Sequence, residues 1–320
     1  MHVTVAICTF NRARLLDATL GALARLRVPD GLAWEVLVVN NNATDDTDAV
    51  VDRHADRLPV RRLYEPLPGK SHAANRALNA ARGALILWID DDVIVDEGWL
   101  EEYVRVAQAW PDAAYFGGTV DPWFEGPAPA WIEANIGLLS EPYALAQHGP
   151  QVFRLGDQPV VGANMATRTD VARRFPFNVH LGPTGGRALR GEDTELVTRL
   201  CRAGFYGVWV GSARVRHRIT VDRLTLDYLW HWYGGLGSFV VQRRGITTDV
   251  PLLFGAPRWA IRRYATLRLK YWLLYPFKRR AWVQTLREVS LMKTYLSEAR
   301  RAVSNRDEKS AGSSEGSGPC

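Results

Sequence analysis

Hydrophobic runs of strand length alternate with helical patterns over the first part of the chain. The runs cover Val3–Thr9, Trp34–Asn40, Val60–Glu65 and Ala84–Ile89. Between them, leucines recur at helical spacing from Leu15 to Leu26, a helix is predicted to start near Asp45, and Ser71–Ala81 is an alanine-rich helical stretch. Strands that are apolar on both faces are typical of a parallel sheet covered by helices. We therefore expect an α/β fold with a doubly wound, mostly parallel sheet, helices on both faces and right-handed crossovers.

The alternation continues beyond Asp92, with one long interruption. The pattern predicts a helix over Trp99–Ala109, a strand over Ala113–Val120, renewed order over Pro159–Met165, a short helix from Thr169, a helix over Thr194–Ala203, and strands over Tyr206–Val210 and Ala213–His217. Residues 121–158 are irregular and rich in Pro, Gly and Trp. A loop of this length inside a domain is usually functional or mobile.

The composition changes beyond Gly245, where Trp, Tyr, Leu and Arg become frequent. One apolar stripe at helical spacing runs along Ala281–Arg301 and consists of Trp282, Leu286, Val289, Met292, Leu296 and Ala299. The last residues are polar and of low complexity, which is typical of disorder. We expect an α/β domain over residues 1–245, a helical extension over residues 246–303 and a disordered tail over residues 304–320.

Positive charge is concentrated in the C-terminal segment. Residues 243–303 contain 14 Lys and Arg against 3 Asp and Glu, whereas residues 1–242 contain 24 against 28. The imbalance indicates a polyanionic partner for this segment only. Basic residues mixed with aromatic ones, as in residues 258–264 and 275–280, favour contact with an anionic membrane surface. The alternative is a helical cap on the core, and no nucleic-acid partner is expected because no recognised motif accompanies the charge.

The cysteines and the hydropathy pattern bear on location. Cys8, Cys201 and Cys320 are odd in number and widely separated, so they form neither a disulfide framework nor a zinc motif. The chain enters a strand pattern at once, which leaves no room for a signal peptide. No stretch reaches the ~18 apolar residues of a transmembrane helix. We expect a cytoplasmic protein, peripheral on the inner face of the plasma membrane if the basic segment binds lipid.

Polar clusters follow three of the predicted strands. Thr9-Phe10-Asn11-Arg12 follows the first, Asn40-Asn41-Asn42 the second and Asp90-Asp91-Asp92 the fourth, and Glu192-Asp193 precedes a helix. Ligands of open α/β sheets bind at the carboxyl ends of strands. Three adjacent carboxylates repel one another unless a cation holds them, and a hard divalent cation is the simplest occupant. A solvated acidic turn is the alternative.

Five motifs in this order resemble the inverting family 2 glycosyltransferases with the GT-A fold. They are Val-Ala-Ile-Cys-Thr-Phe-Asn-Arg (5–12), Val-Val-Asn-Asn-Asn-Ala-Thr-Asp (38–45), Gly-Lys-Ser-His-Ala-Ala-Asn-Arg-Ala (69–77), the Asp triplet and Gly-Glu-Asp-Thr-Glu-Leu (191–196). The resemblance covers roughly residues 1–220. It implies transfer of a sugar from a nucleotide-diphosphate sugar, most simply a UDP-sugar, to a hydroxyl of a glycan or lipid-linked acceptor, with Mn²⁺ or Mg²⁺ as cofactor.

The resemblance also implies roles for single residues. Asp92, Asp90 and His217 correspond to metal ligands, and Asp193 corresponds to the base that takes the acceptor proton, with Glu192 as the fallback. Capping of a helix N-terminus is the alternative role of Asp193. Donor contacts are expected from Thr9, Asn11, Arg12, Asn41, Lys70, Asp90 and Asp91. Asn41 departs from the family pattern, which often has an Asp that accepts a hydrogen bond from the base.

The acceptor side is expected to involve Trp123 and Trp131 in the long loop, which could stack on sugar rings, and Asn164. Two rival functions remain at this point. Sugar-phosphate nucleotidyl transfer uses a similar sheet and metal, although it usually requires a glycine-rich basic loop after the first strand. A nucleotide-sugar-binding scaffold subunit is the rival that is not an enzyme.

Overall fold

The apolar strands assemble into a nine-stranded sheet with the order β3-β2-β1-β4-β8-β6-β9-β5, and β7 also pairs with β9. The strands are β1 (His2–Thr9), β2 (Ala33–Asn40), β3 (Val60–Tyr64), β4 (Leu85–Asp90), β5 (Val93–Val95), β6 (Tyr115–Phe124), β7 (Val152–Arg154), β8 (Met165–Arg168) and β9 (Gly207–Ile219). β1, β2, β3 and β4 pair in parallel, as do β6 and β9. β8 lies antiparallel between β4 and β6. The expected mostly parallel, doubly wound sheet is confirmed.

The computed structural model describes residues 1–156, 158–183, 191–247 and 250–312, and the chain forms two compact units. The first unit comprises Met1–Pro127 and Tyr143–Val221, and the second comprises Ala128–Pro142 and Asp222–Cys320. The units therefore divide near residue 221 and not at the expected residue 245. Part of the long loop also belongs with the C-terminal helices, a link between distant segments that local patterning does not encode.

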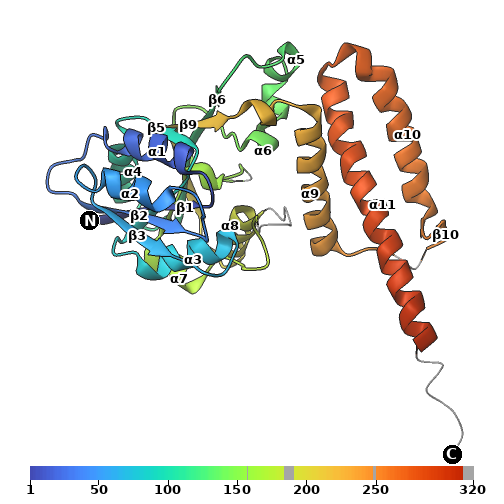
Figure 1. Cartoon of the computed structure of the whole chain (residues 1–320), viewed down its shortest axis with the longest axis horizontal. Helices are drawn as coiled ribbons and strands as arrows, with labels where there is room; N and C mark the ends of the chain where they lie inside the picture. The colour runs from blue at the N-terminus through green and yellow to red at the C-terminus, as the bar shows by residue number, and fades with distance from the viewer. Residues whose placement is uncertain (157, 184–190, 248–249, 313–320) are drawn as a thin grey trace, which may run out of the picture. The chain divides into compact units, whose positions relative to one another are not determined.

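The helices of the first unit lie on both faces of the sheet. They are α1 (Ala13–Leu23), α2 (Thr47–His54), α3 (Lys70–Ala80), α4 (Trp99–Ala109), α7 (Thr169–Arg174) and α8 (Glu192–Arg202). α1 and α2 lie on one face, and α3 and α7 on the other (Figure 1). The strand order reverses between β1 and β4, because the chain moves outward from β1 to β3 and then returns to the other side of β1. The carboxyl ends of β1 and β4 thus flank a topological switch point, the usual ligand site of such sheets.

Two local predictions differ from the structure. The two predicted closing strands are one strand, β9, and its pairing with β6 shifts register between Gly118 and Thr119. Three residues of β9, Gly211–Ala213, are left without a partner on β6 at the predicted break, and such an irregularity bends a strand without ending it. β5 follows the Asp triplet directly and was not predicted, since three residues carry too little pattern.

The second unit is built around three long helices, α9 (Leu226–Arg244), α10 (Arg258–Leu274) and α11 (Arg280–Gly312) (Figure 1). Short elements complete it: α5 (Ala130–Glu133), η1 (Ile136–Leu138), and the hairpin strands β10 (Leu252–Leu253) and β11 (Ala256–Pro257). α6 (Ser140–Tyr143) and the 3-10 turn η3 (Val221–Arg223) link the units, and the 3-10 turn η4 (Tyr275–Phe277) joins α10 to α11. Among the described residues, no helix is long and apolar enough to span a membrane.

The predicted stripe of α11 forms the core of this unit. Trp282, Leu286, Val289 and Ala299 are fully buried. The helix runs to Gly312, past the predicted start of the tail at residue 304. Residues 313–320 of the predicted tail lie outside the described part of the chain.

Candidate active site

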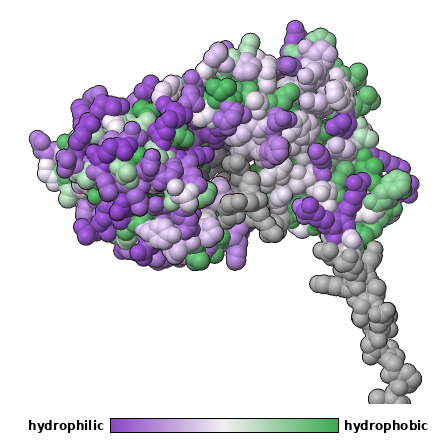
Figure 2. All heavy atoms as spheres, viewed as in Figure 1, coloured by the Kyte–Doolittle hydropathy of each residue, from purple (hydrophilic) through white to green (hydrophobic). Residues whose placement is uncertain are grey.

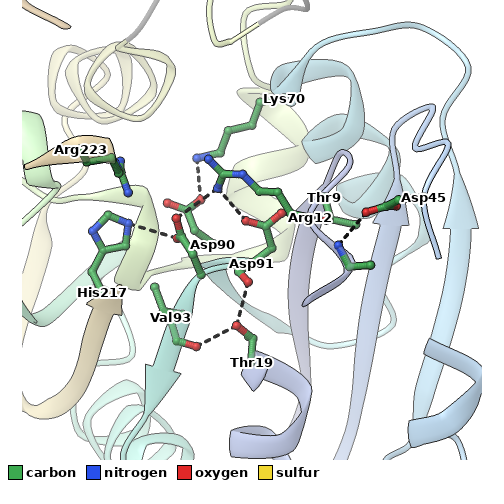
Figure 3. Close-up of polar contacts among 12 residues, drawn as sticks. Thr9, Arg12, Thr19, Asp45, Lys70, Asp90, Asp91, Val93, His217 and Arg223 are labelled. Atoms are coloured by element: carbon green, nitrogen blue, oxygen red, sulfur yellow. Dashed lines mark hydrogen bonds and ion pairs between the residues drawn. The ribbon is translucent and has the colours of Figure 1, made fainter. Parts of the chain in front are cut away.

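The Asp triplet lies at the switch point, at the end of β4. Cys8 pairs with Asp90 in the register of β1 and β4, so Thr9 stands beside the start of the triplet. The Thr19 hydroxyl on α1 lies 2.9 Å from both the Asp91 and the Val93 carbonyl oxygens, which fixes the turn between β4 and β5 (Figure 3). The three carboxylates are therefore held by the fold and do not form a freely solvated turn.

Asp91 anchors the first polar cluster. Its carboxylate accepts hydrogen bonds from the Thr9 hydroxyl (2.7 Å) and from Arg12 Nη1 (3.0 Å), and the residue is 4 % exposed. Burial raises the pKa of Asp91 to about 6, although the charge of Arg12 opposes the rise. The acids Asp91 and Asp92 in turn raise the pKa of Arg12, against the effect of burial. Thr9, Arg12 and Asp91 thus support the triplet and hold one another.

Asp90, Asp92 and His217 form a cluster that could hold a divalent cation. One potential ligand atom from each lies within 4.8 Å of the others, and His217 Nε2 lies 3.1 Å from Asp92 Oδ1. His217 comes from β9 and faces the triplet in Figure 3 because Val93 of β5 pairs with it. Its Nδ1 donates to the Tyr143 carbonyl at 2.6 Å, so a neutral ring presents the Nε2 lone pair to the carboxylates. Two carboxylates and such an imidazole are a suitable donor set for Mn²⁺ or Mg²⁺.

A second acidic pair, Glu192 and Asp193, opens α8. The Asp193 Oδ2 atom accepts a hydrogen bond from the Gly162 backbone N–H at 2.9 Å, so the carboxylate is directed at a residue of another segment. A Cβ atom on Gly162 would lie 2.3 Å from that oxygen, so only glycine permits this approach. Burial and the negative charge of Glu192 raise the pKa of Asp193 to about 7. A carboxyl with this pKa is suited to accept a proton near neutral pH.

Lys70 joins the two acidic groups. Its Nζ atom lies 2.7 Å from Asp90 Oδ1 and 3.4 Å from Glu192 Oε1. Burial alone would lower the pKa of Lys70, but the surrounding charges of Asp90, Asp193 and Glu192 raise it well above its ordinary value. The ammonium group is therefore charged. A pocket at this edge of the sheet is lined by Cys8, Lys70, Trp88, Asp90, Glu192 and Asp193, together with other residues.

The two asparagines of the donor prediction hold backbone. Asn41 Oδ1 accepts from the Gly69 N–H at 2.8 Å, and its amide group donates to the carbonyls of Glu65 and Leu67. Asn41 therefore fixes the loop that leads into α3 and Lys70, and its amide hydrogens are not available to a base. Asn11 Oδ1 accepts from the Thr44 N–H at 2.7 Å and joins the loops after β1 and β2.

The prediction that Asn164 binds the acceptor is wrong. The residue is fully buried, and its oxygen accepts hydrogen bonds from Trp99 Nε1 and the Tyr103 hydroxyl. Its amide donates to the carbonyls of Thr119 and Ala213. An amide with four internal hydrogen bonds has no capacity left for a ligand, so Asn164 holds the core together.

The two loop tryptophans lie in different units. Trp123 belongs to β6 and stacks under the Arg218 guanidinium, which lies 4.5 Å from the ring centroid. Trp131 belongs to the second unit and packs edge-on against Trp282 of α11, with 5.3 Å between ring centroids. The role of Trp131 as a contact of the C-terminal helices is thus observed, and its role in acceptor binding stays a prediction.

Sequence reasoning missed three supporting residues. Gly162 contacts the site through its N–H and Tyr143 through its carbonyl, and Thr19 fixes the triplet from within α1. Gly162 stands in the segment 162–165, whose resemblance to an acceptor-pocket lining drew attention to Asn164 and not to the glycine; a backbone contact such as that of Tyr143 carries no residue signal. The polar Thr19 on the buried face of α1 was a usable signal, because buried hydroxyls require partners.

This fold, with acids at the switch point and a second acidic pair beside them, is that of the glycosyltransferases with the GT-A architecture. The family model for glycosyl transferase family 2 matches residues 4–172, and the chain belongs to this family. It is therefore a glycosyltransferase. This membership removes the nucleotidyltransferase alternative.

Two relatives match over most of their length. The succinoglycan biosynthesis protein ExoM of Rhizobium meliloti is 27% identical over 247 residues, which cover 72% of this chain and 71% of that protein. The glucosyl-dolichyl phosphate glucuronosyltransferase of Haloferax volcanii is 24% identical over 237 residues, which cover 72% of this chain and 73% of that protein.

Solved structures share the fold at low identity. A Pyrobaculum calidifontis mannosyltransferase, PcManGT, in complex with GDP-Man and Mn²⁺ has a TM-score of 0.55 and 18% identity, and covers 99% of this chain and 76% of that chain. S. aureus TarS 1-349 in complex with UDP has a TM-score of 0.51 and 15% identity, and the match covers 91% of this chain and 90% of that chain.

Proposed function

We propose that the protein is an inverting, metal-dependent glycosyltransferase. It transfers a sugar from a nucleotide-diphosphate sugar to a hydroxyl group of a glycan or lipid-linked acceptor, in polysaccharide or glycolipid synthesis. The observation that carries the proposal is the pairing of two sites across Lys70: the cluster of Asp90, Asp92 and His217, and the Asp193 carboxyl with its pKa raised to about 7.

Each site suits one part of the reaction. Asp90, Asp92 and His217 would hold Mn²⁺ or Mg²⁺, which when bound supplies Lewis-acid stabilisation of the diphosphate leaving group. Lys70 adds a fixed positive charge beside Asp90. Asp193 accepts the proton of the attacking hydroxyl. Glu192 is less suited to be the base because its carboxylate forms an ion pair with the Lys70 ammonium at 3.4 Å.

The relatives guide the choice of donor and acceptor. The solved structures hold GDP-Man or UDP, so both nucleotides are donors to test, with UDP-sugars first. Asn41 does not select between them through its amide hydrogens, which are used within the chain. The dolichyl phosphate in the name of one relative supports a lipid-linked acceptor.

Two variants with matched controls test the proposal. Asp92→Ala is expected to abolish the Mn²⁺-dependent part of nucleotide-diphosphate binding in calorimetry, while the exposed Asp96→Ala leaves it intact. Asp193→Asn is expected to lower turnover by about 10²–10⁴ at nearly unchanged donor affinity.

The control for Asp193 is Asp170→Asn, which neutralises an exposed acid in the first turn of α7 and should leave turnover unchanged. Unaltered metal-dependent binding in Asp92→Ala would refute the metal site. Full turnover in Asp193→Asn would refute the assigned base. Donor binding with no turnover on any acceptor would instead favour the scaffold subunit.

A further inference from the structure

The helix α10 has one face that packs within the second unit and one that does not. Ala260, Leu267 and Tyr271 are buried and recur at helical spacing. Ala260 joins Ala256 of the hairpin and Leu296 of α11 in a small apolar cluster. This face gives α10 its place against α11. One face of α10 is therefore packed as the helical-cap alternative requires, and the other face is not.

The other face of α10 exposes large apolar side chains. Leu269, Trp272 and Leu273 are 62%, 57% and 66% exposed, and Phe277 just beyond the helix is 63% exposed. Residues three or four apart lie on the same side of a helix. Leu269, Trp272 and Leu273 therefore share one side of α10, and with Phe277 of the adjoining turn η4 they are the exposed apolar residues that we call the α10 patch. Exposed apolar groups gathered in this way indicate an interaction surface.

The charge around the α10 patch has a single sign. Residues 252–280 contain eight Lys and Arg and no Asp or Glu. Lys270, Lys278, Arg279 and Arg280 lie beside the patch in sequence, and none of them has an ion pair within the described part of the chain. Arg268 instead lies over the Trp272 ring at 5.8 Å. Between residues 280 and 304 of α11 the sequence has two acids, Glu288 and Glu298, and Glu298 pairs with Arg301.

The hairpin before α10 also exposes apolar side chains next to a basic residue. β10 and β11 place Phe254 at the tip, where it is 80% exposed, and Leu252 and Leu253 are 40% and 43% exposed. Phe254 has a φ angle of 49°, a strained conformation for a residue other than glycine. The hairpin leads directly into Arg258 of α10. Figure 2 shows hydrophobic and hydrophilic residues side by side at this end of the second unit, around β10 and the adjoining end of α10.

We propose that the α10 patch and the hairpin tip bind the surface of an anionic lipid bilayer. Exposed Leu, Trp and Phe side chains can enter the headgroup region, while the surrounding cations attract the negative lipid charge. Tryptophan also suits this boundary because its ring is apolar and its N–H is polar. The contact lies on the membrane surface, since no described helix is long and apolar enough to cross it.

Charge complementarity favours lipid over a second copy of the chain. Two copies of the segment 252–280 would bring eight cations against eight, with no acid within the segment to pair with them. The proposal is independent of the catalytic reaction. A soluble acceptor would still be used by a variant that fails to bind membranes.

Co-sedimentation with vesicles tests this proposal on the full chain. The probes are vesicles of phosphatidylcholine alone and of an equal mixture of phosphatidylcholine and phosphatidylglycerol. The charge variant carries Lys278→Gln, Arg279→Gln and Arg280→Gln, and the apolar variant carries Leu269→Ser, Trp272→Ser and Leu273→Ser. The control carries Arg57→Gln, Arg76→Gln and Arg82→Gln, which remove the same charge from exposed sites of the first unit.

The wild type and the control are expected to bind the anionic vesicles and not the neutral ones. The charge variant should bind roughly a hundredfold more weakly, at about fivefold for each of the three cations. Raised salt should weaken the wild type in the same way. The apolar variant should also lose at least tenfold, at any salt concentration.

Other results would overturn the proposal. Absence of wild-type binding to anionic vesicles would do so, as would equal losses in the charge variant and the control. Dimerisation of the wild type that the apolar variant abolishes, without vesicle binding, would assign the face to a second copy. If the apolar variant unfolds, the charge variant decides alone. Turnover on a soluble acceptor separates failure of this proposal from failure of the proposed reaction.

Discussion

At the scale of single residues, the ionisation of Asp193 links the structure to a measurable pH dependence. Burial and the charge of Glu192 raise its pKa to about 7. The proposed base must be ionised before it can accept a proton. We therefore predict that kcat/KM falls about tenfold per pH unit below about pH 7 and levels off above it. A pH profile that stays flat down to the ordinary Asp pKa of 3.8 would contradict this assignment.

The same pKa has a consequence for stability. Between about 3.8 and about 7, the folded chain retains a proton on Asp193 that the unfolded chain has lost. The favourable contribution of this carboxyl is thus complete in acid and is lost as the pH rises toward about 7. Asp193→Asn should gain thermal stability relative to the wild type across this range, and keep a constant gain above it. Thermal unfolding of both proteins over these pH values measures the difference.

The sequence drew attention to the candidate metal ligands and the candidate base, but not to the residues that hold them in place. Asp90, Asp92, His217 and Asp193 stand out because carboxylates and imidazole at strand and helix ends require a chemical reason. Gly162 could not be recognised, because it acts through its N–H and through the absence of a side chain. Asn164 was misread for the opposite reason. A polar residue near a motif looks like a ligand until its partners are known, and its partners come from three distant segments.

At the scale of elements, strand ends were predictable where the pattern is strong. β1, β2 and β4 are apolar on both faces and were found within one or two residues. β5 has three residues and was missed. α9 has mixed faces and three glycines near its middle, Gly234, Gly235 and Gly237, so no stripe marks it as a helix. Its stability comes from packing against α11, which a local pattern does not encode.

The glycines of α9 give a prediction about this packing. A Cβ atom on Gly237 would lie 2.8 Å from the Thr294 Cβ atom of α11, whereas one on Gly234 would lie 3.6 Å from the Thr294 hydroxyl. Thr294 is β-branched and cannot move its Cβ away. Gly237→Ala should therefore destabilise the protein by up to about 2 kcal/mol, the overpacking effect of about 1–3 kcal/mol less the gain of about 1 kcal/mol in helix propensity.

Gly234→Ala is the matched control for this variant. A Cβ atom on Gly234 would be at ordinary van der Waals distance from Thr294, so this substitution should be neutral or should stabilise the protein by up to about 1 kcal/mol. Urea unfolding followed by tryptophan fluorescence compares the two, since Trp230 and Trp282 lie in this unit. Equal effects of the two substitutions would mean that α9 and α11 do not pack as closely as described.

At the scale of the whole molecule, the division of the chain was the least predictable feature. Composition changes at Gly245, but α9 and Ala128–Pro142 belong with α10 and α11. Trp131 packs on Trp282, the Asn135 amide donates to the Trp131 and Lys278 carbonyls, and Glu141 pairs with Arg287 at 2.9 Å. Each contact joins segments more than a hundred residues apart, apart from the local bond of Asn135 to Trp131. Periodicity along the chain reports which face of an element is buried, and not which distant segment buries it.

This division predicts how truncated chains behave. A chain that ends at Gly245 keeps Leu229, Trp232 and Tyr233 of α9, which are buried in the full protein, but loses α11. Leaving such side chains in water forfeits about 1.5–3 kcal/mol each, so this chain should aggregate or bind a hydrophobic dye. A chain that ends at Val303 keeps the stripe from Trp282 to Ala299 and should unfold at the same temperature as the full chain. Sedimentation, dye binding and thermal unfolding of the two truncated chains test the boundary. A monomeric chain ending at Gly245, as stable as the one ending at Val303, would restore the boundary that composition suggests.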